Sequence, residues 1–338
     1  MLNNFDSSSH EDRPDNRMYE LEYPAPAGLG RADTAEAHHS INGESDVRMP
    51  LVIALQGYAD AGQAVAQAST HLIEALEHHS VASFNVDELL DYRSRRPGVT
   101  IDNSKVVGRE NLGLELHLLK DVEDQPFLML SGPEPDLKWK AFSEAVVELS
   151  QRTHVDRVIS LYAAPMTVPH TRPMVVSAHS TNPELIEDYH SWPNRMMIPG
   201  AAALETELQL GKAGFETVGF TAHVPHYIAA SDYPEATHAL LKAVADSADR
   251  QLPLRALESD MARIQQQLAE QVEESQEIAT VVAALEGQYD AEVERLRRAK
   301  DNNLLQPGQD VPTGEELGAE FEAFLQQAAQ RDDDEDDE

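Results

Sequence analysis

A glycine-rich segment, Gly57-Tyr-Ala-Asp-Ala-Gly62, is the first candidate for chemistry, because it follows an apolar run and precedes a helical pattern. Its glycine spacing is that of a phosphate-binding P-loop. Gln63 and Ala64, however, stand where that motif needs lysine and serine or threonine. Asp60 would also place a negative charge at the helix N-terminus, where a phosphate would lie. A capped, tight turn between strand and helix is therefore favoured over a nucleotide site.

A second polar cluster contains His223 and His226, which flank Pro225 close to Asp232. Histidine and aspartate can form an acid–base pair or part of a metal site. The i, i+3 spacing of the two histidines suits zinc only on a helix, and Pro225 opposes a helix there. Solvated loop histidines are the favoured interpretation. His179 has the same interpretation, because no metal-ligand spacing surrounds it.

Several classes of chemistry are excluded by missing residues and motifs. The chain has no cysteine, which removes disulfides, thiolate nucleophiles, cysteine-ligated zinc and iron–sulfur clusters. It has neither the Gly-x-Ser-x-Gly elbow of hydrolases nor the His-Glu-x-x-His motif of zinc proteases. Ser131 and Ser160 end predicted strands without a base that the sequence pairs with them. We therefore assign no catalytic residue, no metal and no cofactor.

Charge and hydropathy restrict the partners. The chain carries 60 acidic and 26 basic residues, a formal net charge of −34. Such a chain should be repelled by nucleic acid and by anionic membranes, so neither is expected as a partner. The sequence contains no run of 18 apolar residues, so no transmembrane helix is predicted. The polar start of the chain lacks the pattern of a secretion signal. We expect a cytoplasmic protein.

The elements that would position these residues alternate between strand and helix. Leu51-Val-Ile-Ala-Leu55 is an apolar run typical of a strand buried on both faces. Further strands are predicted at residues 84–90, 114–118, 126–130, 155–161, 174–178 and 215–222, and helices begin near residues 60, 136, 201 and 234. This order predicts an α/β fold, a mostly parallel sheet flanked by helices. Functional groups of such folds gather at the carboxyl ends of the strands, here the loops at 56–62, 131–136, 162–173 and 223–234.

The sequence divides into four parts. Residues 1–49 are predicted to be a disordered arm and a long loop, and residues 50–252 the α/β core domain. Two mostly apolar heptad series predict a long helix or a helical hairpin over residues 253–301, a C-terminal α-helical appendix with coiled-coil character and a break near Ser275. Residues 302–338 are predicted to be a linker, a short amphipathic helix and an acidic disordered tail.

Several of these motifs together resemble the proteasome assembly chaperone 2 family. Leu55-Gln-Gly-Tyr-Ala-Asp-Ala-Gly62 resembles its G-[WY]-x-D-A-G signature, and Leu130-Ser-Gly-Pro-Glu-Pro135 its glycine–proline loop. Pro225-His-Tyr227 and Tyr233-Pro-Glu-Ala236 resemble its later P-x-Y and Y-P-x-A segments. The resemblance covers roughly residues 50–250 and implies a phosphorylase/hydrolase-like scaffold and oligomerisation. One departure is the acidic end of the chain, which lacks the hydrophobic–Tyr–any tail that docks on proteasome subunits in such chaperones.

Three hypotheses follow. The first is a non-catalytic, chaperone-like module that binds itself as a homo-oligomer, a trimer being one form, and proteasome subunits as candidate partners. The second is an enzyme on a phosphorylase- or peptidase-like scaffold that uses Asp60, Pro133, His223, His226 and Tyr227. The third is a structural homo-oligomer assembled through residues 257–299. The candidate strand-end cleft or interface comprises Gly57, Tyr58, Asp60, Gly62, Gly132, Pro133, Pro165, Pro225, His226, Tyr227, Tyr233 and Pro234.

Overall fold

The computed structural model describes residues 18–22, 49–191 and 195–302. The expectations for the N-terminal arm and loop, the linker, the amphipathic helix and the acidic tail lie outside the described residues, apart from the short strand at residues 19–21. Among the residues that are described, no helix combines the length and the apolar character needed to cross a bilayer.

An eight-stranded mixed sheet forms the centre of the molecule, with the strand order β1-β3-β6-β7-β2-β8-β10-β9. The four central strands, β7, β2, β8 and β10, run parallel, and the strands outside them add antiparallel pairs. Their bounds are β1 Tyr19–Leu21, β2 Met49–Gln56, β3 His78–Phe84, β6 Glu115–Lys120, β7 Pro126–Pro133, β8 Val155–Met166, β9 Val176–Ser180 and β10 Glu216–Pro225. The predicted α/β fold with a mostly parallel sheet is confirmed.

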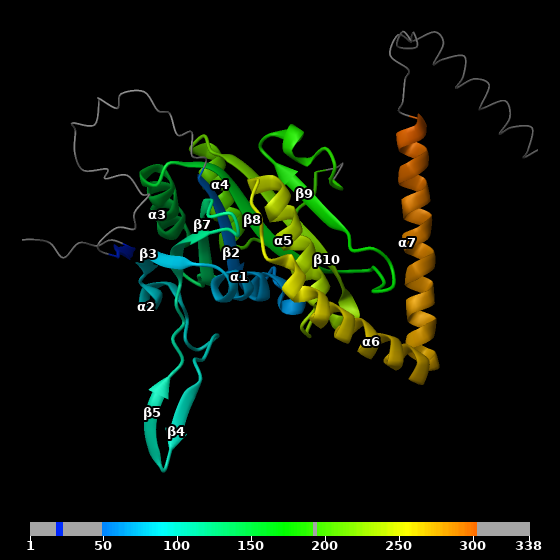
Figure 1. Cartoon of the computed structure of the whole chain (residues 1–338), viewed down its shortest axis with the longest axis horizontal. Helices are drawn as coiled ribbons and strands as arrows, with labels where there is room; N and C mark the ends of the chain where they lie inside the picture. The colour runs from blue at the N-terminus through cyan, green and yellow to red at the C-terminus, as the bar shows by residue number, and fades with distance from the viewer. Residues whose placement is uncertain (1–17, 23–48, 192–194, 303–338) are drawn as a thin grey trace, which may run out of the picture. The chain divides into compact units, whose positions relative to one another are not determined.

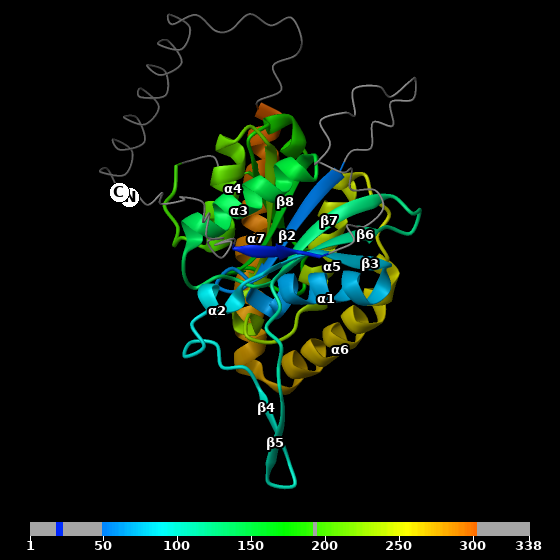
Figure 2. The same cartoon turned by 90° about the vertical axis from the view of Figure 1, so that its left-hand side faces the viewer.

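Helices cover both faces of the sheet (Figure 2). On one face pack α1 (Ala64–Ala75), α5 (Pro234–Ala248) and α6 (Glu258–Glu274), and on the other pack α3 (Trp139–Arg152) and α4 (Ala202–Lys212). Strand β2 serves both layers, because its side chains alternate between Val52 and Ala54 on the α1 side and Leu51, Ile53 and Leu55 on the α3 side. This double burial explains why β2 is apolar at consecutive positions.

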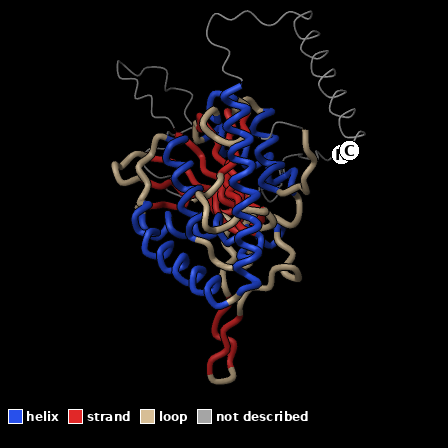
Figure 3. The backbone as a smooth tube through the Cα atoms, turned by 90° about the vertical axis from the view of Figure 1, so that its right-hand side faces the viewer, coloured by secondary structure: helices blue, strands red, loops and turns tan. Residues whose placement is uncertain are grey.

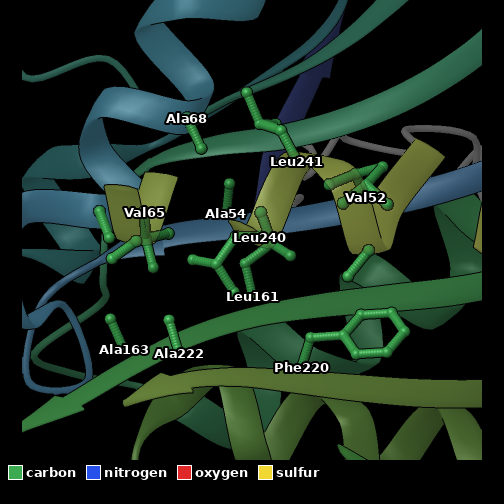
Figure 4. Packing of buried hydrophobic residues seen from close by; sticks show 14 of the residues in the cluster. Val52, Ala54, Val65, Ala68, Leu161, Ala163, Phe220, Ala222, Leu240 and Leu241 are labelled. Carbon is green, nitrogen blue, oxygen red and sulfur yellow. The ribbon is translucent and has the colours of Figure 1, made fainter. Parts of the chain in front are cut away.

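Small residues bring α1 close to the sheet, as Figure 4 shows. Ala54 of β2, Ala163 of β8 and Ala222 of β10 are fully buried and lie in one cluster with Val65 and Ala68 of α1. A short side chain on each strand lets the helix backbone approach the sheet without leaving a void. This close packing fixes the loop between β2 and α1, where the first candidate motif lies.

Three predicted strands differ from the structure at their ends. The strand expected at 84–90 is wrong from residue 85 on, because β3 ends at Phe84 and a short helix, α2 (Val86–Leu89), follows. Residues 162–166 are not part of a loop, because β8 continues to Met166 in register with β10. The strand expected at 174–178 is shifted to Val176–Ser180 and pairs antiparallel with β10 at the sheet edge. Periodicity alone does not reveal these ends, since pairing with a neighbour decides them.

The chain leaves helical geometry at Ser275, where the sequence predicts a break. Helix α6 ends at Glu274 and α7 (Gln276–Asn302) begins after it. Leu268 of α6 is buried in the core cluster, with Met261 and Ile264 packed against it. The compact unit that carries the sheet ends at Glu286, within α7.

A two-stranded ribbon, β4 (Val99–Asp102) and β5 (Lys105–Arg109), extends away from the sheet (Figures 1 and 3). We call residues 99–109 the arm. Every residue of its two strands is exposed. The arm is absent from the elements that the sequence predicts.

Candidate functional site

Two of the predicted motifs meet at Gly62. Its N–H donates to the carbonyl oxygen of Ala229 at 2.7 Å, and its own carbonyl accepts the N–H of Tyr233 at 2.9 Å. Gly62 has a φ of +68°, and a Cβ there would lie 2.9 Å from the Cβ of Tyr233. Only glycine combines this conformation with so close an approach. The turn after β2 is therefore locked to the segment before α5, in which Pro234 occupies the first helical turn.

The side chain of Asp60 caps the start of α1. Its two carboxylate oxygens accept the N–H groups of Val65 at 2.7 Å and Ala66 at 3.2 Å, at the start of α1. Burial raises the pKa of Asp60 to about 6, although these two hydrogen bonds lower it. The side chain of Gln63 donates to Asp232 at 2.7 Å. The carboxylate of Asp60 therefore occupies the N-terminus of α1. The turn is the capped junction that the sequence favours.

Glu134 connects three segments at the strand ends. One carboxylate oxygen accepts the N–H of Tyr58 at 3.0 Å, and the other accepts the N–H of Ala202 at the start of α4 at 2.5 Å. Glu134 is 7% exposed, and a Cβ on Gly57 would lie 2.1 Å from its carboxylate. Sequence reasoning missed Glu134, because no spacing rule distinguishes one carboxylate among 60 acidic residues. Its position inside the Leu130–Pro135 motif was the available signal.

A polar groove lies beside this carboxylate, at the ends of β2 and β7. Its volume is about 570 Å³, and its lining consists of Gln56, Gly57, Arg95, Glu110, Asn111, Leu112, Gly113, Gly132 and Pro133. Gly132 has a φ of +135°, and a Cβ there would lie 2.3 Å from the carbonyl oxygen of Gly113. The groove thus contains three of the predicted residues, Gly57, Gly132 and Pro133.

The remaining predicted residues lie at the ends of β8 and β10. Pro165 and Pro225 are strand residues, paired with Val224 and Met166 respectively. His226 is exposed and lies edge-on to the ring of Tyr227. The hydroxyl of Tyr227 lies 2.6 Å from Nδ1 of His170 and accepts the backbone N–H of the same residue. Burial lowers the pKa of His170 and raises that of Tyr227.

His223 turns away from this group. Its Nε2 lies 2.9 Å from the hydroxyl of Ser177 on β9. Burial, together with the nearby His190, lowers the pKa of His223 to about 4. Asp60, His223 and Tyr227 are therefore each engaged by a different element: α1, β9 and the loop at His170.

A second titratable cluster lies at the sheet edge. Glu207 of α4 accepts the hydroxyl of buried Tyr162 at 2.8 Å, and His179 of β9 lies 3.1 Å from its other oxygen. Burial lowers the pKa of His179, but the hydrogen bond and charge of Glu207 outweigh it, and the pKa is raised. A Cβ on Gly219 would lie 2.3 Å from the His179 ring. A glycine inside a strand, which often marks a close approach, was the sequence signal for this cluster.

The segment that contains these residues matches a known protein family. A family model described as the PAC2 family matches residues 54–272. The chain belongs to the PAC2 family. The resemblance to the proteasome assembly chaperone 2 family is thereby confirmed, and every candidate strand-end residue lies within the matched span. Among proteins with curated descriptions, none matches the chain.

Solved structures share this PAC2 fold. A protein of unknown function from Corynebacterium glutamicum is 52% identical, with a TM-score of 0.75, over 82% of this chain and 99% of that one. A Mycobacterium tuberculosis protein of unknown function is 44% identical, with a TM-score of 0.77, over 87% of this chain and 95% of that one. A proteasome-assembly chaperone homologue of Mycobacterium tuberculosis is 26% identical, with a TM-score of 0.64, over 69% of this chain and 100% of that one.

Proposed function

We propose that this PAC2-family chain is a non-catalytic, chaperone-like module that binds other proteins through its strand-end loops. Proteasome subunits are the first partner class to test. Support comes from the family and from the similarity to a structure described as a proteasome-assembly chaperone homologue. Family membership alone does not fix function, so the surface has to carry the proposal.

The observation that carries it is a set of exposed apolar side chains on two loops joined by one buried carboxylate. The ring of Tyr58 follows β2 and is 67% exposed. Met197, in the segment that leads into α4, is 97% exposed, and its neighbours Met196 and Ile198 are 52% and 56% exposed. Glu134 binds the backbone at Tyr58 and at the start of α4, so it holds both loops on one scaffold. Apolar side chains presented on such fixed loops are typical of protein interfaces.

The polar groups of the same region favour binding over catalysis. The carboxylates of Asp60 and Glu134 each accept two backbone N–H groups. A general base must reach the proton that it removes, whereas these carboxylates hold the loops in place. The enzyme alternative therefore has less support than the protein-binding module.

The experiment is a tagged pull-down from native lysate at low and high salt, read by mass spectrometry. We expect the wild-type chain to recover proteasome subunits. A Tyr58→Ser, Met197→Ser double variant should recover at least about tenfold less, because truncating two central interface residues removes a kcal/mol or more each. Val122→Ser is the matched control, because Val122 is 59% exposed but lies in the turn before β7, at the opposite end of that strand from the strand-end loops.

The outcomes separate two levels of the proposal. Recovery of a different protein that still depends on Tyr58 and Met197 would keep the binding module and refute the link to the proteasome. Equal recovery by the double variant and the wild type would refute the strand-end surface. Recovery of no partner by any variant would refute the module itself.

A further inference from the structure

The polar groove at the ends of β2 and β7 lies where the chain leaves the sheet in two opposite directions. After β2 the chain enters α1 on one face of the sheet, and after β7 it enters α3 on the other face (Figure 2). In open α/β sheets, ligands bind in the crevice that such diverging connections leave beyond the carboxyl ends of the strands. The volume of about 570 Å³ is within the range of small-ligand sites. We call it the strand-end groove.

The walls of the strand-end groove are held in place by the fold itself. Glu134 lies against Gly57 and accepts the N–H of Tyr58, which fixes the turn after β2. Gly132 lies so close to Gly113 that an added Cβ would be 2.3 Å from the carbonyl oxygen of Gly113, which fixes the segment before β6 on the end of β7. A preformed site loses less conformational freedom when a ligand binds. The groove is therefore suited to binding without a rearrangement of its walls.

Arg95 is the one basic residue in the lining of this groove. Its Nη1 is buried and has no hydrogen-bond partner among the described residues. Burial of a guanidinium nitrogen without an acceptor is unfavourable, because the nitrogen has lost water and gained no partner. The residue as a whole is half-buried, so rotation of its end group can bring this nitrogen to a ligand in the groove. The planar guanidinium pairs with a carboxylate through two parallel hydrogen bonds.

The acidic residues around the groove restrict the charge of such an anion. Glu110 lines the groove, and its carboxylate accepts the N–H of Gly98 at 2.8 Å. Glu134 adds a second carboxylate against Gly57. With one guanidinium and two carboxylates nearby, a ligand with a single negative charge is repelled less than a ligand with two. A carboxylate therefore fits the groove better than a phosphate monoester does.

Two amide side chains in the lining provide further hydrogen-bonding groups. Gln56 ends β2, and Asn111 lies in the segment before β6. Neither amide side chain has a hydrogen-bond partner within the part of the chain that the structure describes. Each offers a donor and an acceptor, the same two groups that a peptide bond carries. A ligand in which a carboxylate follows peptide groups can use the guanidinium and both amides, and the C-terminus of a polypeptide is such a ligand.

We infer that the strand-end groove binds the C-terminal carboxylate of a partner polypeptide. Arg95 pairs with the carboxylate, and Gln56 and Asn111 form hydrogen bonds with the last peptide groups. The inference rests on the proposed function, and it specifies which part of a partner the module recognises. Tyr58, which follows Gly57 at the groove and is 67% exposed, is placed to contact the side chains that precede that C-terminus.

The test measures the dissociation constant of N-acetyl-trialanine from the purified full-length chain by saturation-transfer nuclear magnetic resonance. The free acid should bind at least about tenfold more tightly than the C-terminal amide, because the amide cannot form the charge-assisted pair. Arg95→Gln should abolish this preference, and Arg95→Lys should retain part of it. Arg93→Gln is the matched control, because Arg93 is exposed, carries the same charge and lies outside the lining, so the preference should be unchanged.

Two other probes identify the anion. Acetate should bind at least about tenfold more weakly than the free acid, because it has no peptide group. Inorganic phosphate should not displace the peptide at equal concentration. Acetate binding as tight as that of the peptide, or displacement by phosphate, would overturn the assignment to a polypeptide C-terminus. Equal binding of acid and amide, or a preference that survives in an Arg95→Gln protein with an unchanged circular dichroism spectrum, would overturn the pairing with Arg95.

This measurement is independent of the pull-down that tests the proposed function. Recovery of partners through Tyr58 and Met197 without acid-selective peptide binding would refute the strand-end groove as a C-terminus site and leave the proposed function intact. Acid-selective binding that depends on Arg95, without any recovered partner, would refute the proposed function and leave the groove as a peptide site.

Discussion

The strand-end loops hold their carboxylates in hydrogen bonds to the backbone, whereas the arm exposes apolar side chains. At the strand ends, the carboxylates of Asp60 and Glu134 each accept two backbone N–H groups. In the arm, Ile101 and Val106 face each other in register, and each is more than two-thirds exposed. The strand-end carboxylates hold the backbone of their own region, whereas the apolar side chains of the arm are exposed.

Because of this difference, substitutions in the two regions should affect the free energy of unfolding differently. A residue that closes a backbone loop contributes to the free energy of unfolding, because its removal leaves buried N–H groups without acceptors. A residue that contacts only water in the single chain contributes nothing comparable. Substitutions at the strand ends should therefore change stability, and substitutions in the arm should leave it nearly unchanged.

The largest expected effect is at Gly132. Gly132→Ala should lower the free energy of unfolding by at least about 3 kcal/mol, because a positive φ is combined with a contact to rigid backbone. The φ is +135°, and the nearest atom, the carbonyl oxygen of Gly113, lies 2.3 Å from an added Cβ. Urea unfolding followed by circular dichroism measures the change.

Gly108 in the arm is the matched position for that measurement. A Cβ there would meet no atom within 4 Å. Gly108→Ala should change the free energy of unfolding by less than about 0.5 kcal/mol. Equal losses at the two glycines would show that the arm is part of the folding unit and would remove the contrast.

A smaller effect is expected at Glu134. Glu134→Ala removes the acceptor of two N–H groups, at Tyr58 and Ala202, and should cost about 2–3 kcal/mol of unfolding free energy. Glu134→Gln keeps one acceptor oxygen and should recover part of that loss. Glu110→Ala at the arm base removes one exposed hydrogen bond and should cost below about 0.5 kcal/mol. A Glu134→Ala protein as stable as the Glu110→Ala protein would contradict the bridging role.

Much of the fold can be predicted because burial leaves a periodic record. The run Leu51–Leu55 predicts β2, and the alternating leucines at 114, 116 and 118 predict β6, which runs from Glu115. The break at Ser275 follows from the interrupted heptads. The arm leaves no such record, because an element that buries nothing has no hydrophobic period to detect.

The site is less predictable than the fold. Glycines constrained by close approach stand out in sequence, and Gly62 and Gly132 indeed meet backbone or neighbouring side chains. Side-chain partners far apart in sequence do not stand out. Glu134 reaches Ala202 and Tyr162 reaches Glu207 only because folding brings α4 close to both β7 and β8. His223 and His226 are close in sequence, but β10 directs the first toward β9.

The burial of Asp60 should make the free energy of unfolding depend on pH. Burial raises its pKa to about 6, so folding disfavours the charged carboxylate. The stabilisation by its protonated form is complete below the ordinary value near 4 and is lost as the pH rises through about 6. The loss corresponds to between about 1 and 3 kcal/mol.

Asp60→Asn should remove this dependence between pH 4 and 6, since an amide does not titrate over this range. Asp60→Ala should remove it too, but with a further loss of about 1 kcal/mol at every pH, because the cap of α1 is gone. Unfolding free energies of the three proteins, measured at steps across this pH range, check both statements. A pH dependence that survives in Asp60→Asn would assign it to another group.

The smallest effect is expected at His179, which joins an enclosed partner to an exposed surface. Its side chain is 41% exposed, whereas that of Glu207 is 8% exposed. Because Glu207 outweighs burial and raises the pKa of His179, folding favours the protonated ring. That stabilisation is complete below the ordinary value of about 6.5 and is lost as the pH rises through the folded value. Solvent screening keeps it below about 1 kcal/mol.

His179→Gln preserves a donor for Glu207 but does not titrate, so its stability should stay level where that of the wild type declines above neutral pH. Nuclear magnetic resonance titration of the histidine ring protons measures the pKa directly, and Glu207→Gln should lower it. A His179 pKa below its ordinary value in the folded protein would mean that burial prevails over the ion pair. The half-exposed ring would then belong with the enclosed groups of the strand ends, whose ionisation the fold opposes.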